Sequence, residues 1–93
     1  MLLKELRQTC EACPSQWEGT TEDERPIYVR YRWGHLSIRI GNPGESIEAA
    51  VGGAELVSEQ LGDELDGYID EDKVLRIIAG IEVPAGAILN GGG

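Results

Sequence analysis

The sequence has no phenylalanine among its 93 residues, and it has one histidine and two cysteines. Without phenylalanine, the core must consist of isoleucine, valine and leucine with a few tyrosine and tryptophan side chains. The single histidine, His35, is the residue on which any histidine-based acid–base chemistry would have to centre. Two cysteines supply at most half of a structural zinc site, which needs four ligands. We therefore expect no metal centre.

Motifs of catalysis and cofactor binding are also missing. The sequence contains no phosphate-binding loop, no dinucleotide-binding glycine pattern, and no serine, histidine and aspartate set in a recognisable surround. The pair Gly52-Gly53 is too weak a pattern to indicate a site. These absences predict a protein that is not an enzyme, with no cofactor and no catalytic residue.

Long hydrophobic runs are absent as well. No segment approaches the roughly 20 apolar residues that a membrane-spanning helix needs, and the start, MLLKELRQ, is charged by its fourth residue, unlike a signal peptide. We expect a cytoplasmic protein in which Cys10 and Cys13 are reduced thiols. Their Cys-x-x-Cys spacing leaves a partial zinc site and a redox pair open as alternatives.

Basic residues are scarce: eight stand against 17 acidic ones, which gives a net charge of −9. Long-range repulsion then opposes direct binding to nucleic acid or to an anionic membrane, whereas a basic protein partner remains compatible. The charges are also segregated. Residues 25–44 hold four arginines and no acid, and residues 45–72 hold ten acids and no lysine or arginine. Such polarity favours a homo-oligomer, because oppositely charged parts of two copies attract each other.

The arginine-rich stretch reads IYVRYRWGHLSIRIG over residues 27–41 and alternates apolar and polar side chains. This alternation predicts a β-hairpin in which each strand has one inward and one outward face. With Trp33-Gly34 as the loop, every apolar residue meets an apolar partner across the strands. With Gly34-His35 as the loop, Arg30 would face Arg39, which is unfavourable. We prefer the first register, although tryptophan is unusual where the backbone needs a positive φ.

The preferred register divides the hairpin into two faces. The inward side chains are predicted core residues, together with three from a C-terminal helix: Ile27, Val29, Tyr31, Leu36, Ile38, Ile40, Val74, Ile77 and Ile78. The outward side chains form a cationic and partly aromatic face: Tyr28, Arg30, Arg32, His35, Ser37 and Arg39. Two interpretations of this face stay open. Its arginines pair with the protein's own carboxylates, or they hold an anionic ligand, because the planar guanidinium suits phosphate and carboxylate.

The rest of the chain predicts an α+β fold, a four-stranded and mostly antiparallel sheet packed by a C-terminal helix. The sheet would be a meander plus one strand: 15–21, 26–32, 35–41 and 55–61. Short and long helices are expected over 47–51 and 71–79. Residues 1–13 are assigned to a helix, because their leucines and cysteines have helical spacing, with a strand as the alternative. One domain would cover 1–84, followed by a flexible glycine-rich tail over 85–93.

Three runs, CPSQWEG (13–19), YVRYRWGHLSIRIG (28–41) and LGDELDGYIDEDKV (61–74), carry a resemblance to a known group. With them, most of the chain resembles small acidic proteins of actinobacteria and their phages. The resemblance implies a short, self-contained protein associated with a mobile element. It supplies no catalytic residues that could be transferred to this sequence.

Two functions are consistent with these patterns. In the first, the protein is a binding module that sequesters an anionic, phosphate-bearing ligand such as a nucleotide signal, which in a phage would weaken host defence. The ligand-binding residues would be the arginines with their aromatic and histidine neighbours: Tyr28, Arg30, Arg32, Trp33, His35 and Arg39. In the second, the acidic segment 45–72 engages a basic, nucleic-acid-binding host protein as an inhibitor.

Overall fold

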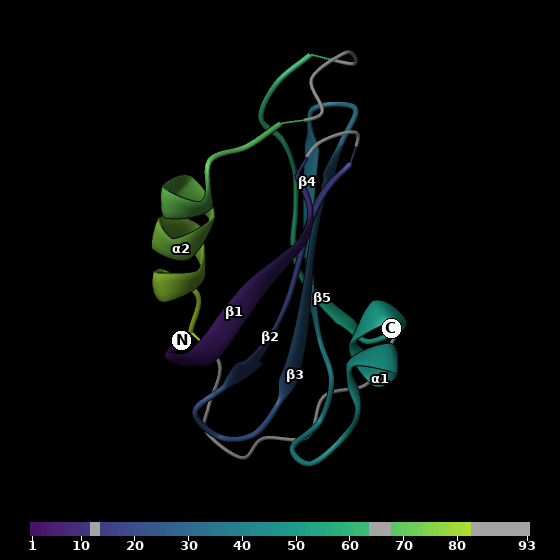
Figure 1. The fold of residues 1–93 in the computed structure, drawn as a ribbon, viewed down its shortest axis with the longest axis vertical. Coiled ribbons are helices and arrows are strands. Elements are labelled where there is room, and N and C mark those ends of the chain that lie inside the picture. Colours follow the sequence, from purple (N-terminus) through teal and green to yellow (C-terminus); the bar gives the residue numbers. More distant parts are fainter. Residues whose placement is uncertain (12–13, 64–67, 83–93) are drawn as a thin grey trace.

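Five β-strands form one antiparallel sheet in which each strand pairs with its neighbour in the sequence (Figure 1). The strands are β1 (Leu3–Cys10), β2 (Ser15–Thr21), β3 (Pro26–Arg32), β4 (His35–Ile40) and β5 (Ala54–Gln60). The helices are α1 (Ile47–Val51) and α2 (Glu71–Ala79). The computed structural model describes residues 1–11, 14–63 and 68–82. The α+β class is confirmed, but in the described residues the sheet has five strands where four were predicted.

The additional strand is β1, so the prediction of a helix over residues 1–13 is wrong. Strand β1 pairs with β2 through a register that is interrupted twice, between Leu3 and Glu5 and between Gln8 and Cys10. Each bulge adds a residue and breaks the alternation of sides. The half-buried residues of β1 are therefore Leu3, Leu6 and Cys10, at intervals of three and four that imitate a helix.

The hairpin of β3 and β4 has the predicted register. Ile27 lies opposite Ile40, Val29 opposite Ile38, and Tyr31 opposite Leu36. The outward residues form the cross-strand pairs that alternate with these apolar pairs. Trp33 and Gly34 form the turn, with φ angles of 56° and 71°. A two-residue turn with both φ angles positive matches the twist of the adjoining strands, which is why this loop fixes the register.

The two helices lie on opposite sides of the sheet (Figure 1). Helix α2 covers the apolar face, where its Val74 and Ile78 join the strands in the core. Helix α1 contacts β3 and β4 on the other side. The buried core cluster is Trp17, Ile27, Val29, Tyr31, Leu36, Ile38, Ile69, Val74 and Ile78. Of the predicted core residues, Ile40 is also buried and Ile77 is half-buried.

Strand β5 begins and ends one residue before the predicted strand, and both helices have their predicted bounds. Val57 and Leu61 pack against the core, as expected. The proposed domain end at residue 84 and the tail over 85–93 lie outside the described residues. In the part of the chain that is described, neither helix has the length and apolar character needed to cross a membrane.

Gly34 is the residue at the hairpin turn that we expect to tolerate substitution least. Its φ is positive, and a Cβ atom there would meet the carbonyl oxygens of Gly62 and Asp63. We predict that Gly34→Ala lowers the free energy of unfolding by about 2 kcal/mol or more, because strain and a backbone clash combine. Gly44→Ala is the matched control: its φ is also positive, but its Cβ would point into open space. Equal losses for both variants in urea titrations would contradict this account.

Candidate functional site

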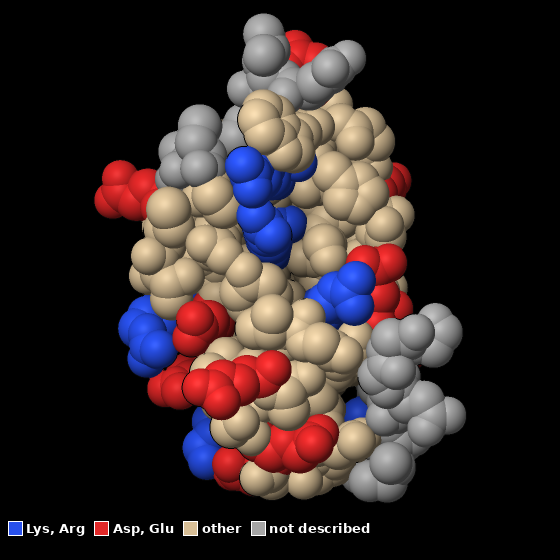
Figure 2. All heavy atoms as spheres, turned by 90° about the vertical axis from the view of Figure 1, so that its right-hand side faces the viewer, with Lys and Arg blue, Asp and Glu red and all other residues tan. Residues whose placement is uncertain are grey.

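A cavity of about 380 Å³ lies on the outward face of the β3–β4 hairpin. It is lined by Tyr28, Arg30, Arg32, Trp33, His35, Ser37, Arg39 and Val51. All six residues that the sequence predicts as ligand-binding are therefore brought together around one cavity. Figure 2 shows this side of the molecule, where blue arginine side chains gather in the middle of the face. Throughout, this is called the cationic cavity.

The cationic cavity follows the strands from the hairpin turn toward α1. Its lining residues lie in three cross-strand rows, with Arg32 opposite His35, Arg30 opposite Ser37, and Tyr28 opposite Arg39. Adjacent rows are two residues apart along each strand, which corresponds to about 7 Å. The three arginines are thus presented in succession along one slot about 14 Å long.

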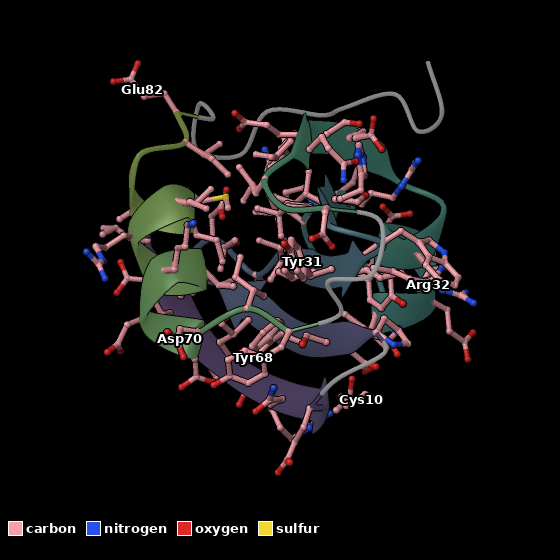
Figure 3. All side chains as sticks on the ribbon, turned by 90° about the horizontal axis from the view of Figure 1, so that it is seen from above. Cys10, Tyr31, Arg32, Tyr68, Asp70 and Glu82 are labelled. Carbon is pink, nitrogen blue, oxygen red and sulfur yellow. The ribbon has the colours of Figure 1, made fainter. Side chains whose placement is uncertain are left out.

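The turn end of the cavity combines a guanidinium with an indole ring. The Arg32 guanidinium carbon lies 4.9 Å from the centre of the Trp33 ring, which is within the range of a cation–π contact. Trp33 exposes 57% of its surface, so much of the ring can still be covered by another molecule. Figure 3 shows Arg32 on the side of the sheet away from α2.

Arg30 stands in the middle row and is half-buried. Its Nε atom is buried and makes no hydrogen bond. A buried donor without a partner costs about 1–3 kcal/mol, so such an atom is uncommon in a stable protein. Within residues 1–11, 14–63 and 68–82, no carboxylate lies at ion-pair distance from Arg30 or Arg32. The interpretation that all these arginines only neutralise the protein's own acids therefore does not fit these two.

Arg39, by contrast, is held by its own chain. Its Nη2 atom lies 3.0 Å from Glu55 Oε2, and its Nη1 atom donates to the Gly53 carbonyl oxygen at 3.1 Å. Ser37 also donates to Glu55 Oε2, over 3.4 Å. At the end of the cavity nearest α1, one arginine is thus neutralised by a carboxylate from β5.

The remaining polar residues of the cavity are oriented by neighbouring strands. His35 Nε2 lies 2.9 Å from the Ser58 hydroxyl on β5. The Tyr28 hydroxyl accepts a hydrogen bond from the Gln16 amide on β2. Both contacts fix the rings at the rim without using the guanidiniums. His35 therefore serves here as a polar wall residue, and no carboxylate among the described residues pairs with it.

Sequence reasoning missed two residues that shape the cavity. Val51 of α1 lines the cavity and is 52% exposed, and no alternation or motif connects it to the hairpin. Glu55 reaches Arg39 because β4 pairs with β5 through a bulge that places these two residues opposite each other. The register of a neighbouring strand was needed to find that pair, and the sequence gives no sign of a bulge there.

A second and larger cavity of about 440 Å³ lies on the α2 side and is acidic. Its lining is Gln8, Glu11, Tyr68, Ile69, Asp70, Glu71 and Asp72. The Tyr68 hydroxyl donates to Asp70 Oδ1 at 2.8 Å, and this bond, with the nearby charge of Asp70, raises the pKa of the phenol (Figure 3). No group of side chains in the described ranges is arranged to hold a metal ion.

The acids of residues 45–72 are divided between the two sides of the molecule. Glu48 belongs to α1, whereas Glu71 and Asp72 belong to α2 across the sheet. The described acids of this segment therefore do not share one face. Cys10 is half-buried at the end of β1, and Cys13 lies outside the described residues.

No protein-family model, no curated protein and no solved structure matches this chain.

Trp33 has a strained backbone conformation with a positive φ, which asparagine adopts at a lower energetic cost. A positive φ costs a residue with a Cβ about 1–2 kcal/mol, and Asn-Gly is the preferred pair for this turn. We predict that Trp33→Asn raises the free energy of unfolding by about 1 kcal/mol, measured by urea denaturation. A loss of more than 1 kcal/mol would show instead that the indole stabilises the fold by packing.

Proposed function

We propose that the protein is a non-enzymatic binding module that sequesters a small, phosphate-bearing anion, such as a nucleotide signal, in the cationic cavity. The observation that carries the proposal is Arg30, whose buried Nε atom has no hydrogen-bond partner. An anion that draws this guanidinium into the cavity would satisfy the donor and gain a charge-assisted hydrogen bond. In a phage-encoded protein, removal of such a signal would weaken the defence of the host.

The chemistry of the lining favours phosphate attached to a planar ring over a bare inorganic anion. Arg30 and Arg32 offer paired donors to phosphate oxygens, which suits the planar guanidinium better than the point charge of lysine. The exposed indole of Trp33 offers a stacking surface for a base, an interaction of about 1–3 kcal/mol. The cavity therefore offers a positive charge for the phosphate, from Arg32, and an aromatic ring for the base, from the adjacent Trp33.

The net charge of −9 restricts the size of the ligand. Long-range repulsion weakens the binding of a polyanion such as nucleic acid, whereas a small ligand interacts mainly with the local positive charge. The cavity volume of about 380 Å³ also falls in the range that is typical of small-molecule sites. A small nucleotide is thus favoured over a strand of RNA or DNA.

The alternative, an acidic inhibitor of a basic host protein, is less favoured. It would present residues 45–72 as one docking surface, and the described acids of that segment lie on both sides of the sheet. Capture of a basic protein that is lost when Asp70, Glu71 and Asp72 are neutralised would nevertheless support it.

Thermal unfolding in the presence of nucleotides tests the proposal. A ligand at a hundred times its dissociation constant adds about 2.7 kcal/mol of stability, which for a domain of this size raises Tm by about 10 °C or more. We predict such a shift for at least one nucleotide in a panel of nucleoside mono-, di- and triphosphates and cyclic dinucleotides. Arg30→Gln should remove the shift, and Trp33→Asn should reduce it while the free protein remains folded.

Arg76→Gln is the matched control, because Arg76 is exposed on α2 and loses the same charge on the opposite side of the sheet. It should leave the nucleotide shift unchanged. Light scattering of the same samples tests the predicted homo-oligomer. The proposal is wrong if no phosphate-bearing ligand raises Tm, or if Arg30→Gln and Arg76→Gln reduce the shift equally.

A further inference from the structure

The three arginines of the cationic cavity are not equivalent in charge. Arg30 and Arg32 have no carboxylate at ion-pair distance in the described part of the chain, whereas Arg39 is paired with Glu55. The row near the turn and the middle row are therefore positive, and the row near α1 is close to neutral. The positive charge of the cavity therefore ends at the row of Arg39, whose charge is offset by the Glu55 carboxylate.

The position of Glu55 limits how far an anion can extend. Its Oε2 atom accepts hydrogen bonds from both Arg39 and Ser37, so the carboxylate lies beside the last row of the cavity and contacts two of its lining residues. A phosphate that approached Arg39 would meet this negative charge at close range. Glu55 and the Gly53 carbonyl already use two of the five N–H donors of Arg39 and Glu55 offsets its charge, so Arg39 attracts a phosphate less than Arg30 or Arg32 does.

One arrangement of a ligand's ring and phosphates would use these contacts together. With the base stacked on Trp33, the first phosphate would lie near Arg32 and Arg30. Additional phosphates would continue along the strands toward the row of Arg39 and Glu55. Two guanidiniums match the charge of a single phosphate monoester, which is about −1.5 to −2 at neutral pH.

We propose, resting on the function proposed above, that the cavity selects nucleoside monophosphates over di- and triphosphates and that Glu55 is the residue that sets this limit. Glu55 acts by occupying Arg39 and by repelling a second phosphate. Its removal would leave three guanidiniums in line, which suits a diphosphate. Specificity for phosphate number would thus come from one carboxylate on β5.

Calorimetric titration of one nucleoside series tests this inference. The probes are adenosine and guanosine mono-, di- and triphosphates without divalent cations, titrated into the wild-type protein and into Glu55→Gln. For the wild type, we expect the monophosphate to bind at least tenfold more tightly than the triphosphate. For Glu55→Gln, the ratio of diphosphate to monophosphate affinity should rise at least tenfold.

Glu59→Gln is the matched control. Glu59 lies on the same strand, is exposed and pairs opposite the core residue Leu36, so its side chain belongs to the other face of β5. The net charge changes equally in both variants, and Glu59→Gln should leave the affinity ratios unchanged. Circular dichroism and Tm establish that both variants are folded, and the order of affinities in the wild type tests the inference without either variant.

The outcomes separate this inference from the function on which it rests. Binding that needs Arg30 but favours triphosphates, or that strengthens equally in both glutamine variants, overturns the role of Glu55 and retains the phosphate site. An absence of binding by every member of the series overturns this inference, and the proposed function is also wrong if the cyclic dinucleotides and other nucleotides of the thermal panel leave Tm unchanged.

Discussion

The pairing of β3 with β4 around Trp33-Gly34 is the constraint on which the rest of the structure depends. Strand side chains alternate, so a slip of one residue would exchange the two faces and bury the arginines. In the observed register, Val29 meets Ile38 and Arg30 meets Ser37. The core and the cationic cavity are thus two sides of the same hairpin and cannot be changed independently.

The two faces are completed in different ways. Helix α2 covers the apolar face. The Trp17 side chain connects the sheet to this helix, because its indole nitrogen donates a hydrogen bond to Glu71 Oε1 at 3.0 Å. On the outward face, the short helix α1 lies near the lower part of β3 and β4, and the upper part keeps Arg32 exposed and Arg30 half-buried. The fold therefore buries the inward apolar side chains of the β3–β4 hairpin, while the charged side remains accessible.

Two local costs occur at the same cavity. Trp33 has a positive φ in a turn that asparagine would fill with less strain, and Arg30 has a buried donor without a partner. Most residues of a protein suit the fold, and the exceptions that lower its stability are expected at functional sites, where they serve binding or catalysis. Their coincidence at one cavity is the main reason to assign it a binding function.

The sequence was sufficient for the hairpin because its pattern is local. Alternation and the cost of placing Arg30 opposite Arg39 decided the register, and the six expected site residues followed from it. Strand β1 could not be found in this way, because its two bulges give its half-buried residues helical intervals. Glu55 and Val51 reach the cavity through contacts between elements, which no periodicity within a segment reveals.

The most direct test of the account is the hydrogen-bonding state of Arg30 in solution. Nitrogen-15 NMR spectra can follow the Nε–H groups of the arginine side chains, with each resonance assigned from a glutamine variant. The account predicts that adenosine or guanosine monophosphate shifts the Arg30 Nε–H resonance and slows its exchange with water, while that of Arg76 is unaffected. An Arg30 resonance that stays unchanged at saturating nucleotide, with the Trp33 indole also unchanged, would contradict it.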